Sequence, residues 1–541
     1  MKYKLFLISL AIVSILLGSV YSIYNTDPHH WGFIVGTALD FIRGKRLFSE
    51  VYVQYGAGQA ILFRVLSFVL PINYTSVGIL TSVAYALHLL VLFACVRRIS
   101  NAKLALQITA IAFLIHPFAI YPWPDYFAGL CISLACYCLL AATQHGGRSR
   151  YVATGLFLFL AFVFRNSYLL SISGALMVFL CLSSLSKDGR KHQLYLSISV
   201  FAGLVAAYLA FLSFQGNAGR WYTQNFGAAT GSSYEYGILT VVRSLLDLVV
   251  TENLSLTVFL GLFLINAHTI LSLLRNGEKE IVNGESERSD RWVGIFLCVL
   301  GCVGISQSLH SLEVFRLQNS SMPLYLGLAW FLSVGPPGAL RIGNWRGWNL
   351  SLGLLAAILL VRAPFILKAT PNSSTNWPIV AHPVRSSIRS FTPSDVPFFR
   401  FHRFQSAENL YYARLSNFLC DGKGKIVNLT RESAIPYLCP GQDHTLILPF
   451  FNPELLRRAD VKETKRVEAG QFLPNELIVA DEPPPSNSSV ALVLIGVAER
   501  PLSIRWLEPA RVSVFRVVPG AATPPRSPST PSQTDPTPPS S

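Results

Sequence analysis

Long apolar runs recur along the first two thirds of this chain and are its dominant pattern. Runs of about 18–22 apolar residues are long enough to cross a bilayer as helices. The segment 57–72 is also apolar but contains Arg64, and we expect a helix lying at the membrane interface there, with a further span as the alternative. We predict about eleven spans, at 4–23, 76–96, 104–122, 126–144, 151–164, 167–184, 193–214, 255–274, 292–309, 322–336 and 348–366.

Basic residues are concentrated on alternate connections between these spans. Short loops rich in Lys and Arg stay on the cytoplasmic side of a membrane. An odd number of spans then places the amino terminus in the cytoplasm and the carboxy-terminal part outside it. The residues behind this orientation are Lys2, Lys4, Arg97, Arg98, Lys103, Arg148, Arg150, Lys187, Arg190, Lys191, Arg275, Lys279, Arg288, Arg291, Arg341 and Arg346.

The pattern changes from about Thr370, where prolines, charges and short β-type runs replace the long apolar runs. We predict strands at 425–429, 445–448, 476–479, 490–495 and 511–518, and helices at 408–419 and 453–461. The fold class is therefore a membrane all-α protein with a small extracytoplasmic α/β domain at its carboxy-terminal end. The three parts are a polytopic domain at 1–366, an α/β domain at 367–520, and a disordered Pro/Ser-rich tail at 521–541.

Composition supports the membrane assignment and removes one function class. The 541 residues are 51% hydrophobic and only 13% charged, whereas soluble domains carry about 25% charged residues. The net charge of +15 reflects topology and a basic outer domain, so it is not evidence for nucleic-acid binding. Only Cys420 and Cys439 of the nine cysteines lie in the outer domain. They fit a disulfide formed in an oxidising compartment, with two buried thiols as the alternative.

Side chains that could take part in catalysis or ligand binding gather on the outer side of the predicted topology. Asp27, His29, His30 and Trp31 follow the first span, and the same loop contains Glu50 and Tyr55. Charged groups close to a membrane are costly and tend to be paired or functional. The other outer residues are Trp123 and Asp125 in a tight turn, Arg165 at the end of a span, Arg220, Trp221 and Tyr222 in a long loop, and His310, Glu313 and Arg316 in another loop.

Each of these residues also has a purely structural interpretation. Asp27 and Asp125 fit helix caps next to proline. Arg165 and Arg316 fit interfacial anchors. Glu313 is three residues from Arg316, so these two fit a helical ion pair. The alternatives stay open for single residues, and it is the collection of acids and bases on one face that favours a functional site.

The first outer loop carries a recognisable order of features. An acidic residue at Asp27 is followed by a helix, by the turn Arg43-Gly-Lys-Arg-Leu-Phe48, and by Glu50 before Gln54-Tyr-Gly56. Together with Phe164-Arg-Asn-Ser-Tyr168 and the span pattern from 1 to 366, this loop resembles the GT-C superfamily of polytopic glycosyltransferases. That superfamily includes protein O-mannosyltransferases and aminoarabinose transferases. The pair His29-His30 is unfamiliar as a feature of the superfamily.

The resemblance implies a donor sugar joined to a polyprenyl phosphate. Asp27 is then the catalytic base that accepts the proton of the acceptor hydroxyl, and Asp125 is a second acid that orients the acceptor or holds a divalent ion. The metal requirement stays open. Cations gather near the leaving phosphate, and Arg165, Arg220, His310 and Arg316 are the candidates. His29, His30, Trp31, Glu50, Tyr55, Trp123, Trp221, Tyr222 and Glu313 are candidates for contacts with the sugar or the acceptor.

These features predict a transferase of the bacterial inner membrane that works on its periplasmic side. We expect transfer of a sugar, with inversion, to an envelope glycan, a lipid or a protein. One alternative is an O-antigen polymerase or ligase with its arginines in one large outer loop. Another is a transporter or flippase, in which polar groups or broken helices are expected at mid-span. A third is a scaffold without catalytic activity.

Overall fold

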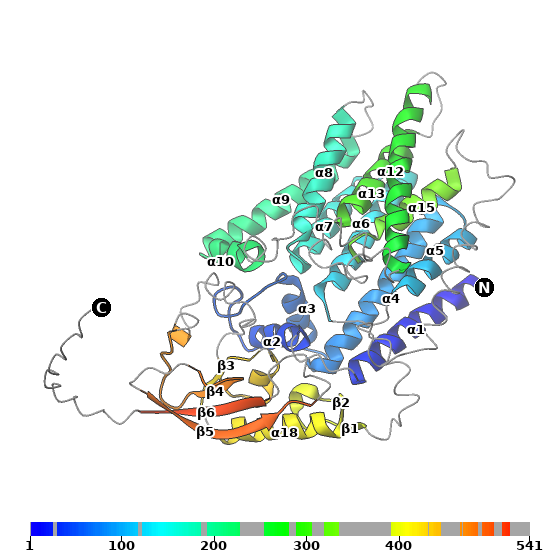
Figure 1. Cartoon of the computed structure of the whole chain (residues 1–541). Helices are drawn as coiled ribbons and strands as arrows, with labels where there is room; N and C mark the ends of the chain where they lie inside the picture. The colour runs from blue at the N-terminus through cyan, green and yellow to red at the C-terminus, as the bar shows by residue number, and fades with distance from the viewer. Residues whose placement is uncertain are drawn as a thin grey trace, which may run out of the picture.

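The computed structural model consists of a bundle of helices packed against a smaller domain that contains a β-sheet (Figure 1). The helical part is described as far as Val334, and the sheet domain is described from Phe391 onward. The residues that the structure describes are 2–24, 30–116, 122–184, 192–227, 254–280, 288–305, 319–334, 391–422, 424–430, 432–444, 466–467, 469–484, 490–501 and 511–519.

Long apolar helices dominate the described part of the bundle. The helices are α1 (Lys2–Tyr24), α4 (Tyr74–Ile99), α5 (Ala102–Ile115), α6 (Pro124–His145), α7 (Arg148–Phe164), α8 (Tyr168–Ser184), α9 (His192–Phe214), α12 (Leu254–Glu280), α13 (Arg288–Gly304) and α15 (Pro323–Val334). Within the described residues, four segments are long and apolar enough to cross a membrane, at Tyr3–Tyr24, Tyr74–Ile99, Pro124–His145 and Leu194–Phe214.

The helical architecture predicted from the apolar runs is confirmed. In the predicted span at 104–122, α5 ends at Ile115, and residues 117–121 lie outside the described residues. The predicted span at 348–366 lies outside the described residues, so the total of eleven spans stays a prediction.

Local sequence signals mark where several of these helices begin and end. The Asn73 side chain accepts a hydrogen bond from the backbone N–H of Ser76 at 3.0 Å and so caps the start of α4. Pro124 lies in the first turn of α6, where a missing N–H has no cost. Gly146 and Gly147 both adopt positive φ between α6 and α7, which lets the chain reverse. The start of α6 and the end of α7 therefore lie at the same end of the bundle.

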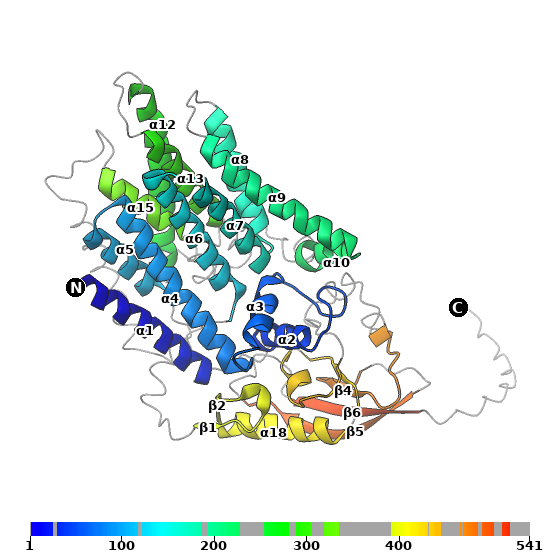
Figure 2. The same cartoon turned by 180° about the vertical axis from the view of Figure 1, so that it is seen from behind.

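A layer of short helices separates the bundle from the sheet domain, as Figures 1 and 2 show from two sides. It contains α2 (His30–Ile42) and α3 (Gly58–Leu66). The helix α3 falls inside the interfacial helix predicted at 57–72 but is shorter, and its Arg64 side chain donates to the carbonyl oxygen of Phe41. Next to this layer, α10 (Ala218–Tyr222) continues into the π-helical turn η2 (Thr223–Gly227).

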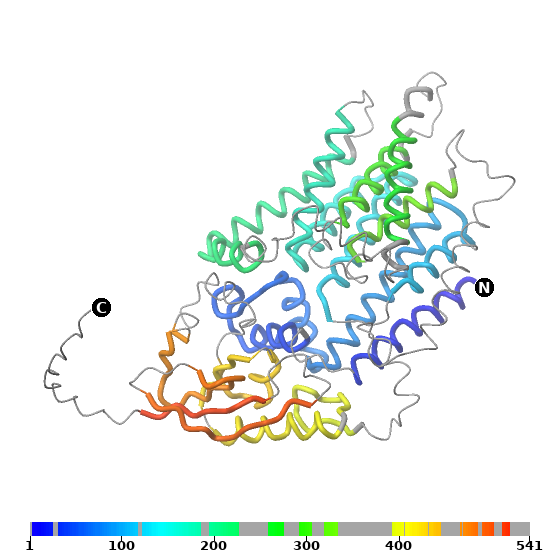
Figure 3. Tube along the Cα trace, viewed as in Figure 1, coloured from blue at the N-terminus to red at the C-terminus, as the bar shows by residue number. Residues whose placement is uncertain are grey.

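The sheet domain is built on four strands in the order β3-β4-β6-β5. The strand β3 pairs in parallel with β4, and the other pairs are antiparallel. A separate two-stranded sheet joins β1 to β2. The elements are β1 (Phe391–Pro393), η5 (Pro397–Phe399), β2 (Arg403–Gln405), α18 (Ser406–Asp421), β3 (Ile426–Asn428), η6 (Ile435–Tyr437), β4 (Leu477–Ala480), β5 (Val490–Glu499) and β6 (Arg511–Pro519). The trace in Figure 3 places α18 along the sheet, on the side away from the bundle.

Most of the predicted elements of this domain are confirmed. The strands predicted at 425–429, 476–479, 490–495 and 511–518 correspond to β3, β4, β5 and β6, and the helix predicted at 408–419 corresponds to α18. The strand at 445–448, the helix at 453–461 and the tail at 521–541 lie outside the described residues. A disulfide joins Cys420 to Cys439, with 5.3 Å between their Cα atoms.

A buried charged cluster holds the interior of the sheet domain together. The Arg500 guanidinium contacts Glu432 and Asp481, each at 2.5 Å. The Tyr411 hydroxyl donates to Glu432 at 2.5 Å. All four side chains belong to the sheet domain, so these contacts join segments within that domain.

The two parts of the chain contact each other closely at the ends of α1 and α2. The fully buried His402 donates from Nδ1 to the carbonyl oxygen of Ser22 at 3.0 Å, because a carbonyl oxygen can only accept. Ser22 lies in the last turn of α1, where carbonyl groups lack partners within the helix. A Cβ at Gly32 of α2 would clash with the backbone nitrogen of Ala434, so glycine permits the close approach. The sheet domain is therefore docked on the bundle at this end.

Candidate active site

Asp125 and Arg165 meet at the end of the bundle that faces the layer of short helices. Asp125 lies in the first turn of α6, and Arg165 directly follows α7. Because α6 and α7 run antiparallel, these two residues come together although forty positions separate them. Arg165 Nη1 lies 2.5 Å from Asp125 Oδ2, and both side chains are almost completely buried.

This ion pair has unused hydrogen-bonding capacity. The Asp125 Oδ1 atom is buried and has no hydrogen-bond partner among the described residues. Arg165 also donates from Nε to the Ser167 hydroxyl at 3.2 Å. A buried ion pair recovers the cost of desolvation only when its remaining donors and acceptors are satisfied, so the open oxygen is an energetic cost. A ligand hydroxyl that donated to Oδ1 would remove that cost.

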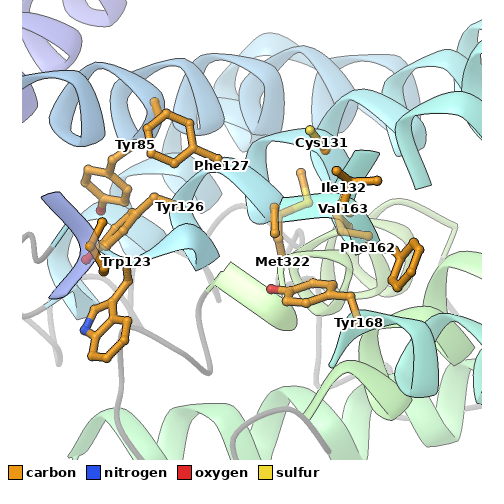
Figure 4. Close-up of a cluster of buried hydrophobic side chains, with 14 of the residues drawn as sticks. Tyr85, Trp123, Tyr126, Phe127, Cys131, Ile132, Phe162, Val163, Tyr168 and Met322 are labelled. Carbon is orange, nitrogen blue, oxygen red and sulfur yellow. The ribbon is translucent and has the colours of Figure 1, made fainter. Parts of the chain in front are cut away.

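Aromatic rings pack beside the pair. The Arg165 guanidinium carbon lies 5.2 Å from the centre of the Tyr55 ring, within the range of a cation–π contact. The Tyr55 ring meets Trp123 edge to face at 4.8 Å. Trp123, Tyr126 and Tyr85 form one group of rings at the start of α6 (Figure 4). Tyr55 and Trp123, both proposed from the sequence as sugar contacts, thus lie beside the Asp125–Arg165 pair.

Backbone contacts fasten the loop between α2 and α3 to the end of α7. The Asn166 backbone N–H donates to the Tyr55 carbonyl oxygen at 2.6 Å. Gly56 has a φ of +155°, and a Cβ there would clash with the carbonyl oxygens of Val163 and Phe164. Only glycine allows the loop to lie so close to the helix end. The position of the Tyr55 ring over Arg165 is therefore set by the backbone as well as by the side chains.

Polar side chains of η2 extend this network. The Gln224 side chain accepts from the Val53 N–H at 3.0 Å and donates to the Phe48 carbonyl oxygen at 2.9 Å, and it is buried. The Asn166 side chain donates to Asn225. Sequence reasoning did not select Gln224, Asn225 or Asn166. Asn166 belongs to the Phe164–Tyr168 motif, so its position next to Arg165 was the one sequence feature that could have identified it as a site residue.

The remaining predicted site residues fall in several environments. Trp31 is fully buried against Tyr21 and Tyr74, where it packs α1, α2 and α4 together. Trp221 is buried and meets Phe162 edge to face, whereas its neighbours Arg220 and Tyr222 are exposed. Exposed Glu50 pairs with Arg46 at 3.3 Å. The structure therefore places Trp31 as a packing residue, and it leaves Arg220 and Tyr222 accessible.

Several predicted site residues cannot be placed. Asp27, His29, His310, Glu313 and Arg316 lie outside the described residues, and for His30 only the backbone at the start of α2 is described. Their roles stay predictions. Within the residues that the structure does describe, no three His, Cys, Asp or Glu side chains come together in a group able to hold a metal ion.

The comparison with solved structures gives the fold. The crystal structure of ArnT from Cupriavidus metallidurans in the apo state superimposes with a TM-score of 0.54 and 12% sequence identity, over 95% of this chain and 97% of that one. The oligosaccharyltransferase of Archaeoglobus fulgidus, tethered with an acceptor peptide, matches with a TM-score of 0.46 and 10% identity, over 88% of this chain and 69% of that one. No family model and no curated protein sequence matches the chain.

The chain is therefore a polytopic membrane protein with a carboxy-terminal α/β domain. Its fold is shared with the ArnT structure, in agreement with the fold that the GT-C resemblance of the first outer loop predicted. At 12% identity the match establishes the architecture and not the activity. The chemistry has to be argued from the residues at the site.

Proposed function

We propose that this protein is a glycosyltransferase that moves a sugar from a polyprenyl-phosphate-linked donor to an acceptor hydroxyl. The observation that carries the proposal is the buried Asp125–Arg165 pair, whose Oδ1 atom has no partner among the described residues. The pair lies at one end of a GT-C fold, beside Tyr55 and Trp123. The acid suits the hydroxyls of a sugar, the cation suits a phosphate, and the aromatic rings suit a sugar face. Their position at one end of a membrane bundle suits a ligand whose lipid tail lies in the bilayer.

The proposed reaction is a single displacement at the anomeric carbon. The acceptor hydroxyl gives its proton to the Asp27 carboxylate as its oxygen attacks the anomeric carbon. The bond between that carbon and the phosphate oxygen breaks, and its electron pair leaves with the polyprenyl phosphate. Attack from the face opposite the leaving group inverts the anomeric centre. Asp125 accepts a hydrogen bond from a hydroxyl of the sugar or the acceptor.

Cations near the leaving phosphate stabilise its developing charge. Arg165 supplies one such charge next to Asp125. Exposed Arg220 supplies a second from α10, and we assign His310 and Arg316 to the same role. His29, His30, Glu50, Trp221, Tyr222 and Glu313 remain our candidates for further contacts with the sugar or the acceptor. A divalent ion next to Asp125 is compatible with this scheme and is not required by any step in it.

The distribution of charge favours a transferase over a transporter. Among the described residues of the helical part, the buried Asp, Glu, Lys and Arg side chains are Asp40, Asp125 and Arg165. Each of them lies at or near the end of a helix. A transporter is expected to hold its polar substrate groups near mid-membrane. We place the protein in the bacterial inner membrane, with the sheet domain and the site on the periplasmic side.

The test compares envelope glycans by mass spectrometry in a strain that lacks the protein. The strain is complemented with the native chain, with Asp27→Asn or with Asp125→Asn. We expect the deletion to remove one sugar and only the native chain to restore it fully. The exposed carboxylate Asp395 offers a matched control, because Asp395→Asn makes the same chemical change away from the site. Full restoration by Asp27→Asn at equal expression would remove its assigned role, and altered transport with every glycan intact would favour a transporter.

A further inference from the structure

The helix α2 connects the sheet domain to the candidate site. Its first turn approaches the sheet domain at Gly32, against Ala434. Its last turn contacts the same domain through Asp40. Between these points Phe33 meets the Tyr55 ring edge to face at 6.1 Å. Since Tyr55 lies over Arg165, a continuous set of packed residues leads from the sheet domain to the ion pair.

Asp40 is the centre of a polar cluster at the contact between the two parts. The Tyr437 hydroxyl donates to Asp40 Oδ2 at 3.0 Å. His444 Nε2 donates to Asp40 Oδ2 at 3.1 Å and lies 2.9 Å from Oδ1. Lys45 Nζ forms an ion pair with Asp40 Oδ1 at 3.1 Å and lies 3.3 Å from His444 Nε2. Asp40, Tyr437 and His444 are almost completely buried, and the partly exposed Lys45 lies at the edge of the cluster.

The electrostatics of the cluster favour an ionised Asp40. Burial alone would raise the pKa of the Asp40 carboxyl, but the hydrogen bond with His444 and the charges of His444 and Lys45 hold that pKa below its ordinary value. A charged hydrogen bond in a water-poor site is stronger and more directional than a neutral one. The cluster therefore fixes the end of α2 and the start of the loop at Lys45.

We propose that Tyr437 and His444 are positioning residues for glycosyl transfer, acting through Asp40. They hold α2 and the loop that follows it, and this loop places Tyr55 against the Asp125–Arg165 pair. The inference rests on the proposed function and deepens it. The sheet domain then forms part of the catalytic architecture, whereas a domain that is only a stabilising cover would affect stability alone.

The chain offers a matched pair of variants for this test. Tyr437→Phe removes one buried hydrogen bond to a carboxylate across the contact with the bundle. Tyr411→Phe removes the same kind of bond to Glu432 wholly inside the sheet domain. Both hydroxyls are buried in the same domain, so the two variants should cost similar stability. Only the first should affect the reaction.

The measurement uses the full-length protein in detergent, with membrane extract of the deletion strain as the source of donor and acceptor. A donor titration separates kcat from the apparent KM for the donor. We expect Tyr437→Phe to lower kcat about tenfold or more with the apparent KM changed less than about twofold, since small misplacements of reacting groups are costly. Tyr411→Phe should leave both values within about twofold of the native chain. Equal effects of the two variants on kcat would overturn the proposal.

Two further comparisons keep the result interpretable. His444→Gln keeps a donor near the position of Nε2 and should recover most of the activity that His444→Leu loses. If Tyr437 acts through Asp40, adding Tyr437→Phe to Asp40→Asn should cause no further loss of kcat. An additive loss, or equal activity of the Gln and Leu variants, would overturn the proposal.

One control and one physical measurement separate this proposal from the proposed function. The native chain in the same assay reports on the function itself, because the absence of any sugar transfer by the native chain refutes the proposed function, whereas activity retained by Asp27→Asn removes only the role assigned to Asp27. Hydrogen exchange of the segment 43–57 reports on positioning without any substrate. We expect faster exchange there in Tyr437→Phe than in Tyr411→Phe, and identical exchange in the two variants would refute the positioning role.

Discussion

Protonation of His402 should weaken the contact between the sheet domain and the bundle. Burial lowers the pKa of His402 to about 4, although its hydrogen bond to the Ser22 carbonyl opposes that shift. Its ring lies 4.9 Å from the Tyr74 ring and 4.5 Å from the Phe404 ring, in surroundings that disfavour a charged imidazole. At neutral pH the ring is therefore uncharged and its Nδ1–H caps α1.

The direction of the pH effect follows from the two pKa values. In the unfolded chain His402 has an ordinary pKa of 6.5, so between pH 6.5 and about 4 it binds a proton that the folded chain does not bind. Folding stability therefore falls as the pH drops through this window and is unaffected above it. A pKa shift from 6.5 to about 4 corresponds to a loss of about 3 kcal/mol in the free energy of unfolding. The full loss is reached once the pH is below the pKa of His402 in the folded chain.

The assay is a series of thermal unfolding curves in detergent between pH 7.5 and 4, for the native chain and for His402→Asn. The Asn amide offers a donor near the position of Nδ1 but does not titrate. It loses the ring packing, so we expect the variant to be less stable by about 2 kcal/mol at pH 7.5. Its disadvantage should shrink or reverse as the pH falls, because only the native chain loses the further 3 kcal/mol or so. Parallel pH profiles for the two proteins would refute the reasoning.

Two other substitutions test the interior of each part. Arg165→Met should lower the free energy of unfolding by about 3–5 kcal/mol, measured by thermal unfolding, because it leaves the buried Asp125 carboxylate without its cation. Adding Asp125→Asn should recover part of that loss. Unchanged stability in Arg165→Met would contradict the buried ion pair. Replacing both Cys420 and Cys439 by Ser should cost about 3 kcal/mol for a loop of this length, measured by urea unfolding, with dithiothreitol producing the same shift in the native chain. A native chain insensitive to the reductant would contradict that expectation.

Local patterns account for the parts of the fold that sequence analysis predicted well. The helix α4 was expected at 76–96 and is found at Tyr74–Ile99. An unbroken apolar run of this length predicts a helix well, because a single segment that crosses a membrane can satisfy its own backbone hydrogen bonds only as a helix. The strands β5 and β6 were predicted for a related reason, because each is a short run rich in β-branched residues between polar or proline-rich segments. In both cases the information lies within the element itself.

The candidate site was only partly predictable. Asp125, Arg165, Tyr55 and Trp123 were each selected for residue type and for the predicted face of the membrane, and the structure brings these four together. Gln224 carried no signal, because an uncharged amide in a loop is common. Its two bonds, to Val53 and Phe48, join segments more than 170 residues apart.

The sequence by itself determined a polytopic membrane chain, and it predicted that basic loops lie on one side of the membrane and the candidate site residues on the other. These follow from hydrophobicity and charge, which act on each segment separately. Only the tertiary structure decided that Arg165 pairs with Asp125, that the Tyr55 ring packs on Arg165, and that the sheet domain contacts α2 through Asp40. Those contacts depend on how helices and loops pack against one another, and no property of a single segment specifies its partner.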